Sequence, residues 1–143
     1  MKGEKTMNKV AVVYWSGTGN TQAMAEAVAQ AAGAELFAAD AFNGDLVENY
    51  DAIGFGCPSM GSEQLEEGEF EPMFEGCKSH LSGKKIALFG SYGWGDGEWM
   101  RNWEADCAAL GATLVADCVI CQETPDDEAL TACEALGKAL AEG

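Results

Sequence analysis

Apolar runs of strand length alternate with helical stretches along this chain, and the alternation constrains its fold more than any other feature. It predicts an α/β fold in three layers, in which a doubly wound, five-stranded parallel sheet carries helices on both faces. With 143 residues and no repeat, low-complexity tract or linker, the chain is expected to form one domain over residues 9–143, after an N-terminal tail at 1–8. The expected strands are 10–14, 34–39, 52–57, 84–90 and 113–120. The expected helices follow the first strand or cover 70–80, 99–110 and 125–140.

A polar turn with two glycines joins the first strand to an alanine-rich helix, which Gly33 is expected to end. The two glycines let backbone N–H groups turn inward, and the neighbouring hydroxyl and amide side chains add donors at the helix N-terminus. The turn therefore predicts a phosphate site made of Ser16, Gly17, Thr18, Gly19, Asn20 and Thr21. A turn that merely joins a strand to a helix is the alternative.

The phosphate would be held by neutral groups, because no Lys or Arg lies between Lys9 and Lys78. The P-loop of nucleotide hydrolases ends in Gly-Lys followed by Ser or Thr, and Asn20 and Thr21 stand in that place here. The dinucleotide-binding fingerprint also fails, since its third glycine would fall at Gln22. Both nucleotide-binding classes are therefore disfavoured.

The formal net charge of −16 makes nucleic acid and anionic membrane surfaces poor partners and basic protein surfaces good ones. Solubility is the alternative reason for such a charge. The six cysteines fit free thiols in a reducing compartment, and no apolar stretch has the length of a membrane span. A cytoplasmic protein with neither nucleic-acid nor membrane partners is expected.

Two further loops follow the third and fourth expected strands, at residues 58–68 and 92–99. The carboxyl ends of parallel strands form the ligand-binding edge of such a sheet, so these loops and the phosphate turn are expected to converge on one site. Met60 and Trp94 lie among glycines and polar residues, outside any periodic apolar pattern, so both are expected to be exposed. A phosphate site beside an exposed methionine and an exposed tryptophan predicts a phosphorylated ligand with a flat aromatic ring, such as FMN.

Three motifs in these loops resemble those of flavodoxins, the small FMN electron carriers, and the resemblance extends over the chain from Lys9 onward. The motifs are SGTGNT at 16–21, CPSMGSE at 57–63 and SYGWGDG at 91–97. Because the fifth strand leads directly to 121–125 without an inserted loop, the chain resembles the short-chain type and, in its motifs, the flavodoxins of anaerobic bacteria. The resemblance implies a flavodoxin-like sheet in the order 2-1-3-4-5, and a monomer is expected.

The resemblance implies a low-potential electron carrier rather than an enzyme. The carrier would bind FMN non-covalently and shuttle single electrons between redox enzymes through the semiquinone/hydroquinone couple. Its partners would be redox proteins with basic docking surfaces, such as ferredoxin-type reductases or oxidoreductases. The polar side chains of the first motif would hold the phosphate, with help from the backbone of its two glycines. The further cofactor-binding residues would be Pro58, Ser59, Met60, Gly61, Ser62, Glu63, Ser91, Tyr92, Gly93, Trp94, Gly95 and Asp96.

Within that set, Met60 and Trp94 would sandwich the flavin ring. Gly61 would tune the redox potential, because in flavodoxins the peptide after this methionine flips on one-electron reduction, and glycine makes the flip easy. Some flavodoxins carry a serine that touches the phosphate where this chain has Pro58. Either Ser59 substitutes for that contact here, or the four donors of the first motif suffice.

Acidic residues around the ring are expected to lower the potential of the second reduction step, because the fully reduced ring is anionic. This acidic rim would consist of Glu63, Glu66, Glu67, Asp96 and Glu98, and Glu63 would also accept a ring N–H. Arg101, the nearest basic residue in the sequence, is expected to point away from the rim, which would then have no nearby cation. The patch of Glu66, Glu67, Glu69 and Glu71 is expected to dock partners, with a merely solvated face as the alternative.

Two other functions stay open at this point: a phosphate- or FMN-binding module that carries no electrons, and a small FMN quinone reductase. A phospho-acceptor receiver needs an Asp cluster at the end of the first strand, where this chain has hydroxyl residues. A quinone reductase needs a substrate pocket over the ring, which Trp94 would obstruct. Cys118 and Cys121 are expected to be buried thiols rather than a metal or redox pair, and His80 a surface residue.

Overall fold

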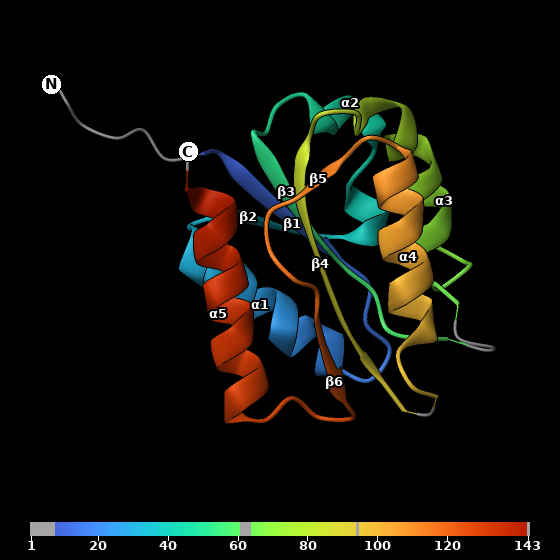
Figure 1. Cartoon of the computed structure of the whole chain (residues 1–143), viewed down its shortest axis with the longest axis vertical. Coiled ribbons are helices and arrows are strands. Elements are labelled where there is room, and N and C mark those ends of the chain that lie inside the picture. Colours follow the sequence, from blue (N-terminus) through green and yellow to red (C-terminus); the bar gives the residue numbers. More distant parts are fainter. Residues whose placement is uncertain (1–7, 61–63, 94, 143) are drawn as a thin grey trace, which may run out of the picture.

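The computed structural model describes residues 8–60, 64–93 and 95–142, and it confirms the three-layer α/β fold (Figure 1). The parallel sheet has the expected order β2-β1-β3-β4-β5, and β6 pairs with β4 beyond β5. Its strands are β1 Val10–Tyr14, β2 Glu35–Ala38, β3 Ala52–Gly56, β4 Lys85–Tyr92, β5 Thr113–Leu114 and β6 Val119–Gln122. The helices are α1 Asn20–Ala32, α2 Gly44–Val47, α3 Phe70–Cys77, α4 Glu98–Ala109 and α5 Asp127–Ala141, with 3₁₀ turns at Ala39–Ala41 and Lys78–His80.

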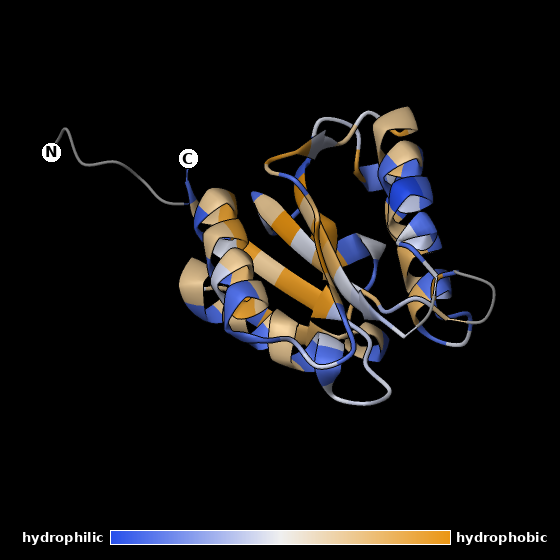
Figure 2. Cartoon of the chain, turned by 60° about the horizontal axis from the view of Figure 1, so that its bottom comes forward, coloured by the Kyte–Doolittle hydropathy of each residue, from blue (hydrophilic) through white to orange (hydrophobic). Residues whose placement is uncertain are grey.

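The sheet separates two apolar layers, because successive side chains of a strand point to opposite faces. Figure 2 shows that the strands between the helices are mainly apolar. On β1, Val12 lies in the layer shared with α1 and α5, which pack against each other. Val13 lies in the opposite layer, which α3 and α4 cover (Figure 1). Both side chains are fully buried, as expected for a central strand of a doubly wound sheet.

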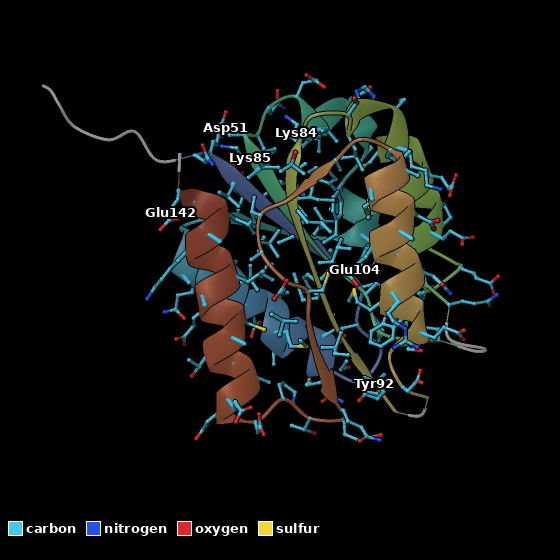
Figure 3. All side chains as sticks on the ribbon, viewed as in Figure 1. Asp51, Lys84, Lys85, Tyr92, Glu104 and Glu142 are labelled. Atoms are coloured by element: carbon cyan, nitrogen blue, oxygen red, sulfur yellow. The ribbon has the colours of Figure 1, made fainter. Side chains whose placement is uncertain are left out.

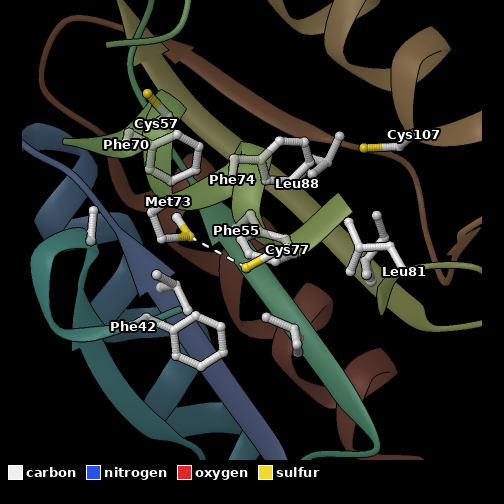
Figure 4. Close-up of a cluster of buried hydrophobic side chains, with 14 of the residues drawn as sticks. Phe42, Phe55, Cys57, Phe70, Met73, Phe74, Cys77, Leu81, Leu88 and Cys107 are labelled. Carbon is white, nitrogen blue, oxygen red and sulfur yellow. Dashed lines mark hydrogen bonds between the residues drawn. The ribbon is translucent and has the colours of Figure 1, made fainter. Parts of the chain in front are cut away.

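Aromatic rings fill the layer under α3 and α4 (Figure 4). Phe74 packs edge-on against Phe55 of β3 and Trp103 of α4, with ring centroids 5.1 and 5.7 Å apart. Each such pair contributes roughly 0.5–1.5 kcal/mol beyond the area that it buries. Cys77 lies in the same layer, with its Sγ 3.7 Å from Sδ of Met73. This face therefore gives a rigid base to the loops that leave β3 and β4.

The helices begin and end near the residues that the sequence predicts. Gly33 ends α1 in the left-handed conformation, with a φ of 65°, and its N–H donates to the carbonyls of Ala29 and Gln30. The helix expected at 70–80 is α3 followed by a 3₁₀ turn, which tightens its last residues. Within the described residues, none of the helices is long and apolar enough to cross a bilayer.

The prediction of one continuous strand over 113–120 is wrong, because the middle of this segment leaves the sheet. Leu114 of β5 pairs with Ile86, whereas Val119 of β6 pairs with Phe89. Five steps along this edge, from 114 to 119, therefore match three steps along β4, from 86 to 89, so two extra residues bulge out. The bulge turns Cys118 toward α4, where its Sγ donates to Oε2 of Glu104 at 3.0 Å.

The fourth strand is longer than expected and ends at Tyr92 instead of residue 90. Ser91 pairs with Cys121 and Tyr92 pairs with Gln122, so the sheet partner β6 holds both residues in β4. The first residues of the third motif are therefore part of the sheet, and the loop begins at Gly93. This gives two of the expected site residues the rigidity of a central strand.

Candidate cofactor site

The polar turn lies at the carboxyl edge of the sheet, where it connects β1 to α1. The N–H of Gly19 donates to Oγ of Ser16 at 3.0 Å, and the N–H of Asn20 donates to Oγ1 of Thr18 at 3.5 Å. Gly19 is the N-cap of α1, with a φ of 94°, and it has no side chain to accept a bond from the first helical turn. The positive end of the helix dipole is therefore left open to an anion.

Thr21 is buried beneath the turn rather than exposed in it, with only 1% of its surface accessible. Its Oγ1 lies 3.4 Å from Oγ of Ser91 and accepts the Ser91 N–H at the same distance. Ser91, in β4, is also buried. The first and third motifs are thus joined through a side chain of each.

The second loop leaves β3 at Cys57 and runs beside β4. The N–H of Ser59 donates to the carbonyl of Ser91 at 3.0 Å. Met60 is joined to Gln64 by two backbone hydrogen bonds of 2.7 and 2.8 Å, which form an isolated antiparallel bridge. The Met60 side chain is 38% exposed, which confirms the expected exposure. Gly61, Ser62 and Glu63, which the resemblance assigns to the site, lie outside the described residues.

The third loop connects β4 to α4 and contains two glycines with positive φ, Gly95 at 89° and Gly97 at 93°. Trp94, expected to stack on the flavin ring, lies outside the described residues. Arg101 donates from Nη2 to Oδ1 of Asp96 at 2.9 Å and from Nη1 to the Asp96 carbonyl at 3.1 Å. The expectation that Arg101 points away from the rim is wrong, because it lies within the first turn of α4 and its long side chain reaches back over the loop. The guanidinium lowers the pKa of the Asp96 carboxyl below its ordinary value.

The three loops enclose a cavity of about 400 Å³, a volume in the range of small-molecule and cofactor sites. The predicted residues that line it are Gly17, Thr18, Asn20, Pro58, Ser59, Met60, Ser91, Tyr92 and Gly93. Five further predicted residues lie within the described part of the chain but do not line the cavity. Ser16, Gly19 and Thr21 form the turn behind it, and Gly95 and Asp96 belong to the loop at its side. The expected convergence of the loops is therefore confirmed.

Two residues that the sequence did not point to, Trp15 and Glu123, also line the cavity. Trp15 directly precedes the turn, and its Nε1 donates to Oε1 of Glu69 at 2.9 Å. Glu123 follows β6 in the left-handed conformation, with a φ of 59°, and its N–H donates to the carbonyl of Tyr92 at 2.9 Å. Trp15 could have been predicted as a site residue, because it lies next to the glycine turn in the sequence. Glu123 could not, because the pairing of β4 with β6 places it at the cavity.

The glutamates before α3 have structural partners. Oε1 and Oε2 of Glu66 accept the N–H groups of Gly68, Glu69 and Phe70, at 2.7, 2.7 and 2.8 Å, and so cap the start of the helix. Partial burial raises the pKa of the Glu66 carboxyl, but these three bonds outweigh it and leave the pKa below its ordinary value. Of the four glutamates in the expected docking patch, Glu66 and Glu69 are thus engaged within the chain.

A second cavity, of about 430 Å³, lies between β6 and the start of α5. It is a poor phosphate site, because Asp126 and Glu128 are its charged residues and the N-terminus of α5 is already capped. The cap is Asp126, whose Oδ1 accepts the N–H of Ala129 at 2.8 Å. The cavity at the glycine turn is therefore the better candidate for an anionic ligand.

Cys118 and Cys121 have separate partners in the two layers of the fold. Cys118 contacts Glu104, whereas Sγ of Cys121 lies 3.7 Å from Sδ of Met24, in the opposite layer of the fold. Among the described residues, no group of three or more His, Cys, Asp or Glu residues is arranged to hold a metal ion. Burial raises the pKa of both thiols above the ordinary range, which disfavours the reactive thiolate. His80, expected at the surface, is half-buried beside the Glu48 carboxylate, 3.5 Å away.

Comparison with known proteins gives one consistent family. The family model described as Flavodoxin matches residues 12–137. The chain is 47% identical over 137 residues to the flavodoxin of Megasphaera elsdenii, a match that covers 92% of this chain and 98% of that protein. It is 46% identical over 135 residues to the flavodoxin of Clostridium beijerinckii, with 91% and 97% covered. The solution structure of two-electron reduced Megasphaera elsdenii flavodoxin superposes with a TM-score of 0.83 at 44% identity, covering 92% of this chain and 97% of that one.

Proposed function

The chain belongs to the flavodoxin family of FMN-binding, low-potential electron carriers, and we propose that its FMN binds in the cavity of about 400 Å³ between the three loops. It is an electron carrier of the short-chain type rather than an enzyme. The observation that supports this site best is the convergence of all three predicted motifs on one cavity. The bound FMN supplies the redox chemistry, and the protein supplies binding, orientation and electrostatics.

The phosphate of FMN would be held by the turn before α1. Thr18 and Asn20 line the cavity. Asn20 is also the first residue of α1, so the uncapped N-terminus of this helix, the positive end of its dipole, faces the cavity. Ser16 would fix the shape of the turn, because its hydroxyl accepts the Gly19 N–H. Thr21 would support the turn without touching the phosphate, since its buried hydroxyl accepts the Ser91 N–H and so ties the turn to β4. A neutral set of donors binds the phosphate without cancelling its negative charge.

The flat ring would lie between the second and third loops. Met60 offers an exposed thioether on one side, and Trp15 and Tyr92 offer aromatic surface within the same cavity. We retain Trp94 as the stacking residue and Gly61 as the residue whose peptide adapts to reduction, on the strength of the resemblance. The two backbone bonds between Met60 and Gln64 would hold the chain on either side of Gly61.

The low potential would come from negative charge near the ring. Glu123 lines the cavity, and the exposed Asp96 and Glu98 belong to the loop and helix at its side. These carboxylates repel an electron added to the flavin and so lower its midpoint potential, and the low dielectric of a partly closed site strengthens the repulsion. Arg101 offsets part of it through its ion pair with Asp96.

The partners are other redox proteins, and their docking surfaces would be basic. The net charge of −16 favours such partners, and the exposed acidic residues at the carboxyl edge of the sheet would bring the cofactor end toward them. We further propose a reducing, cytoplasmic setting, supported by six cysteines that are all free. A monomer is proposed because the exposed large apolar side chains among the described residues, Leu36, Met60 and Ile120, do not share one strand or helix.

The phosphate assignment is tested by titrating the apoprotein with FMN and with riboflavin, which lacks the phosphate. Replacing Thr18 by Val removes a hydroxyl from the cavity and should weaken FMN binding about tenfold, on the scale of a hydrogen bond to a charged group. Riboflavin binding should change little. Thr124→Val, in the neighbouring cavity, is the matched control. If Thr18→Val leaves FMN affinity unchanged, or weakens both ligands equally, the phosphate does not bind at this turn.

A further inference from the structure

The hydrogen-bond ladder between β3 and β4 is interrupted beside the cofactor cavity. The Cys57 N–H donates to Phe89 at 3.1 Å and the Ser59 N–H donates to Ser91 at 3.0 Å, so parallel pairing continues beyond the end of β3. Regular pairing would next join the Cys57 carbonyl to the Ser91 N–H. Instead, the carbonyl accepts Nε1–H of Trp99 at 3.1 Å, and the Ser91 N–H donates to Thr21 at 3.4 Å. Two side chains thus replace one rung of the ladder.

Trp99 occupies the junction of the second and third loops. It is the second residue of α4, directly after the third loop, and only 2% of its surface is exposed. Its ring lies 5.5 Å from that of Tyr92, which lines the cofactor cavity. The residue that it bonds, Cys57, opens the loop that carries Met60.

Gly90 fixes the position of this junction. A Cβ at residue 90 would lie 2.2 Å from the Cys57 carbonyl oxygen and 3.3 Å from Cζ2 of Trp99. The backbone of β4 therefore lies against both groups, and only glycine leaves room for their hydrogen bond. Since the ring and the carbonyl are buried together, water cannot replace the indole N–H without a rearrangement.

We propose that Trp99 is a positioning residue whose indole N–H holds residues 58–60 in register with residues 95–97, which precede α4, and so sets the spacing of the second and third loops at the FMN cavity. The inference rests on the proposed function, because it assigns the segment to the FMN site. Without the N–H, the Cys57 carbonyl is left as a buried acceptor with no partner, or it turns to recover one. Either change alters the course of the chain toward Met60.

The chain offers a matched control for this N–H. Trp103 lies one turn further along α4, is also 2% exposed, and its buried Nε1 has no hydrogen-bond partner in the described structure. Trp99→Phe and Trp103→Phe therefore remove the same atoms from the same helix, but only the first removes a hydrogen bond. Single-site incorporation of 3-benzothienylalanine at position 99, which keeps the ring size and lacks the N–H, serves if Trp99→Phe does not fold.

Three quantities are measured for each variant: the FMN dissociation constant, the two one-electron midpoint potentials, and the exchange rate of the Ser59 amide hydrogen in the apoprotein. We expect Trp99→Phe to bind FMN at least fivefold more weakly than Trp103→Phe, on the scale set by an unsatisfied buried acceptor. We also expect a changed separation of its two potentials and faster Ser59 exchange. The benzothienyl variant should behave like Trp99→Phe.

Equal FMN affinity, equal potentials and equal Ser59 exchange in the two Phe variants would overturn the proposal and leave Trp99 with a packing role. The same conclusion follows if the benzothienyl variant matches the wild type. A wild-type protein that binds no FMN would count against the proposed function instead. In that case the exchange of Ser59 in the apoprotein variants still decides whether the indole N–H holds the loop.

Discussion

At the scale of single residues, the acidic side chains near the site divide into those that shape the backbone and those that only add charge. Glu66 belongs to the first group, since three backbone N–H groups donate to its carboxylate. Its own N–H donates to Sγ of Cys57 at 3.3 Å, so it also joins the two ends of the second loop. Glu67, its neighbour, is exposed and adds charge. An acidic patch in a sequence does not distinguish these roles.

Replacing Glu66 by Ala should lower the free energy of unfolding by about 1 kcal/mol at pH 7, the usual cost of losing a helix cap. The pKa of Glu66 is lowered in the folded state, so its stabilisation is complete above the unfolded pKa of about 4.3 and is lost as the pH falls through the lower, folded value. The difference from wild type in urea unfolding should therefore shrink below about pH 4. Glu67→Ala is the control. A difference that stays constant from pH 7 to pH 3 would show that the carboxylate is not the stabilising group.

Arg101 places a positive charge in the loop beside the cofactor cavity, through its ion pair with Asp96. Arg101→Gln removes the positive charge that is paired with Asp96, so the site becomes more negative. Both FMN midpoint potentials should then fall, because each added electron meets less compensating charge. Lys85→Gln removes the same charge at the opposite edge of the sheet and should leave the potentials nearly unchanged (Figure 3). Potentiometry at low ionic strength compares the two, and equal shifts would mean that Arg101 has no local effect.

At the scale of elements, the sequence predicts what local patterns determine. The alternation of strands and helices, the end of α1 at Gly33 and the exposure of Met60 are confirmed. The bulge between β5 and β6 was missed, because no glycine or proline marks it and pairing with a distant strand decides it. Arg101 was misjudged for a similar reason, since the direction of a long side chain depends on the neighbouring loop. Glu123 enters the cavity only through the pairing of β6 with β4.

The N-cap of α5 lies outside the proposed FMN site, so its effect on stability can be measured without changing the cofactor site. Asp126 accepts the Ala129 N–H and faces the second cavity, outside the proposed FMN site. Asp126→Ala should lower the free energy of unfolding by about 1 kcal/mol and leave the affinity for FMN unchanged. Asp127→Ala, in the first turn of the same helix, controls for the lost charge. Thermal unfolding and FMN titration measure the two quantities, and a clear loss of FMN affinity would extend the cofactor site to α5.

At the scale of the whole molecule, the charges are distributed unevenly along the direction of the strands. Lys84 and Lys85 lie at the end opposite to Tyr92 and the cofactor cavity (Figure 3). Asp51 lines the same surface pocket as these two lysines. At the cavity end, the side chains of Asp96 and Glu123 are exposed, and Arg101 is the described cation that contacts the loops there. The field of the molecule therefore favours approach of a basic partner to the end where electrons would enter and leave.

Stepwise anaerobic reduction of the FMN-reconstituted protein, followed by visible spectroscopy and potentiometry, tests directly whether the protein carries single electrons. A one-electron carrier should give two well-separated one-electron steps, the second at low potential. A single two-electron step would rule out a one-electron carrier and favour a quinone reductase. Failure of the folded protein to bind FMN would rule out the proposed cofactor site itself.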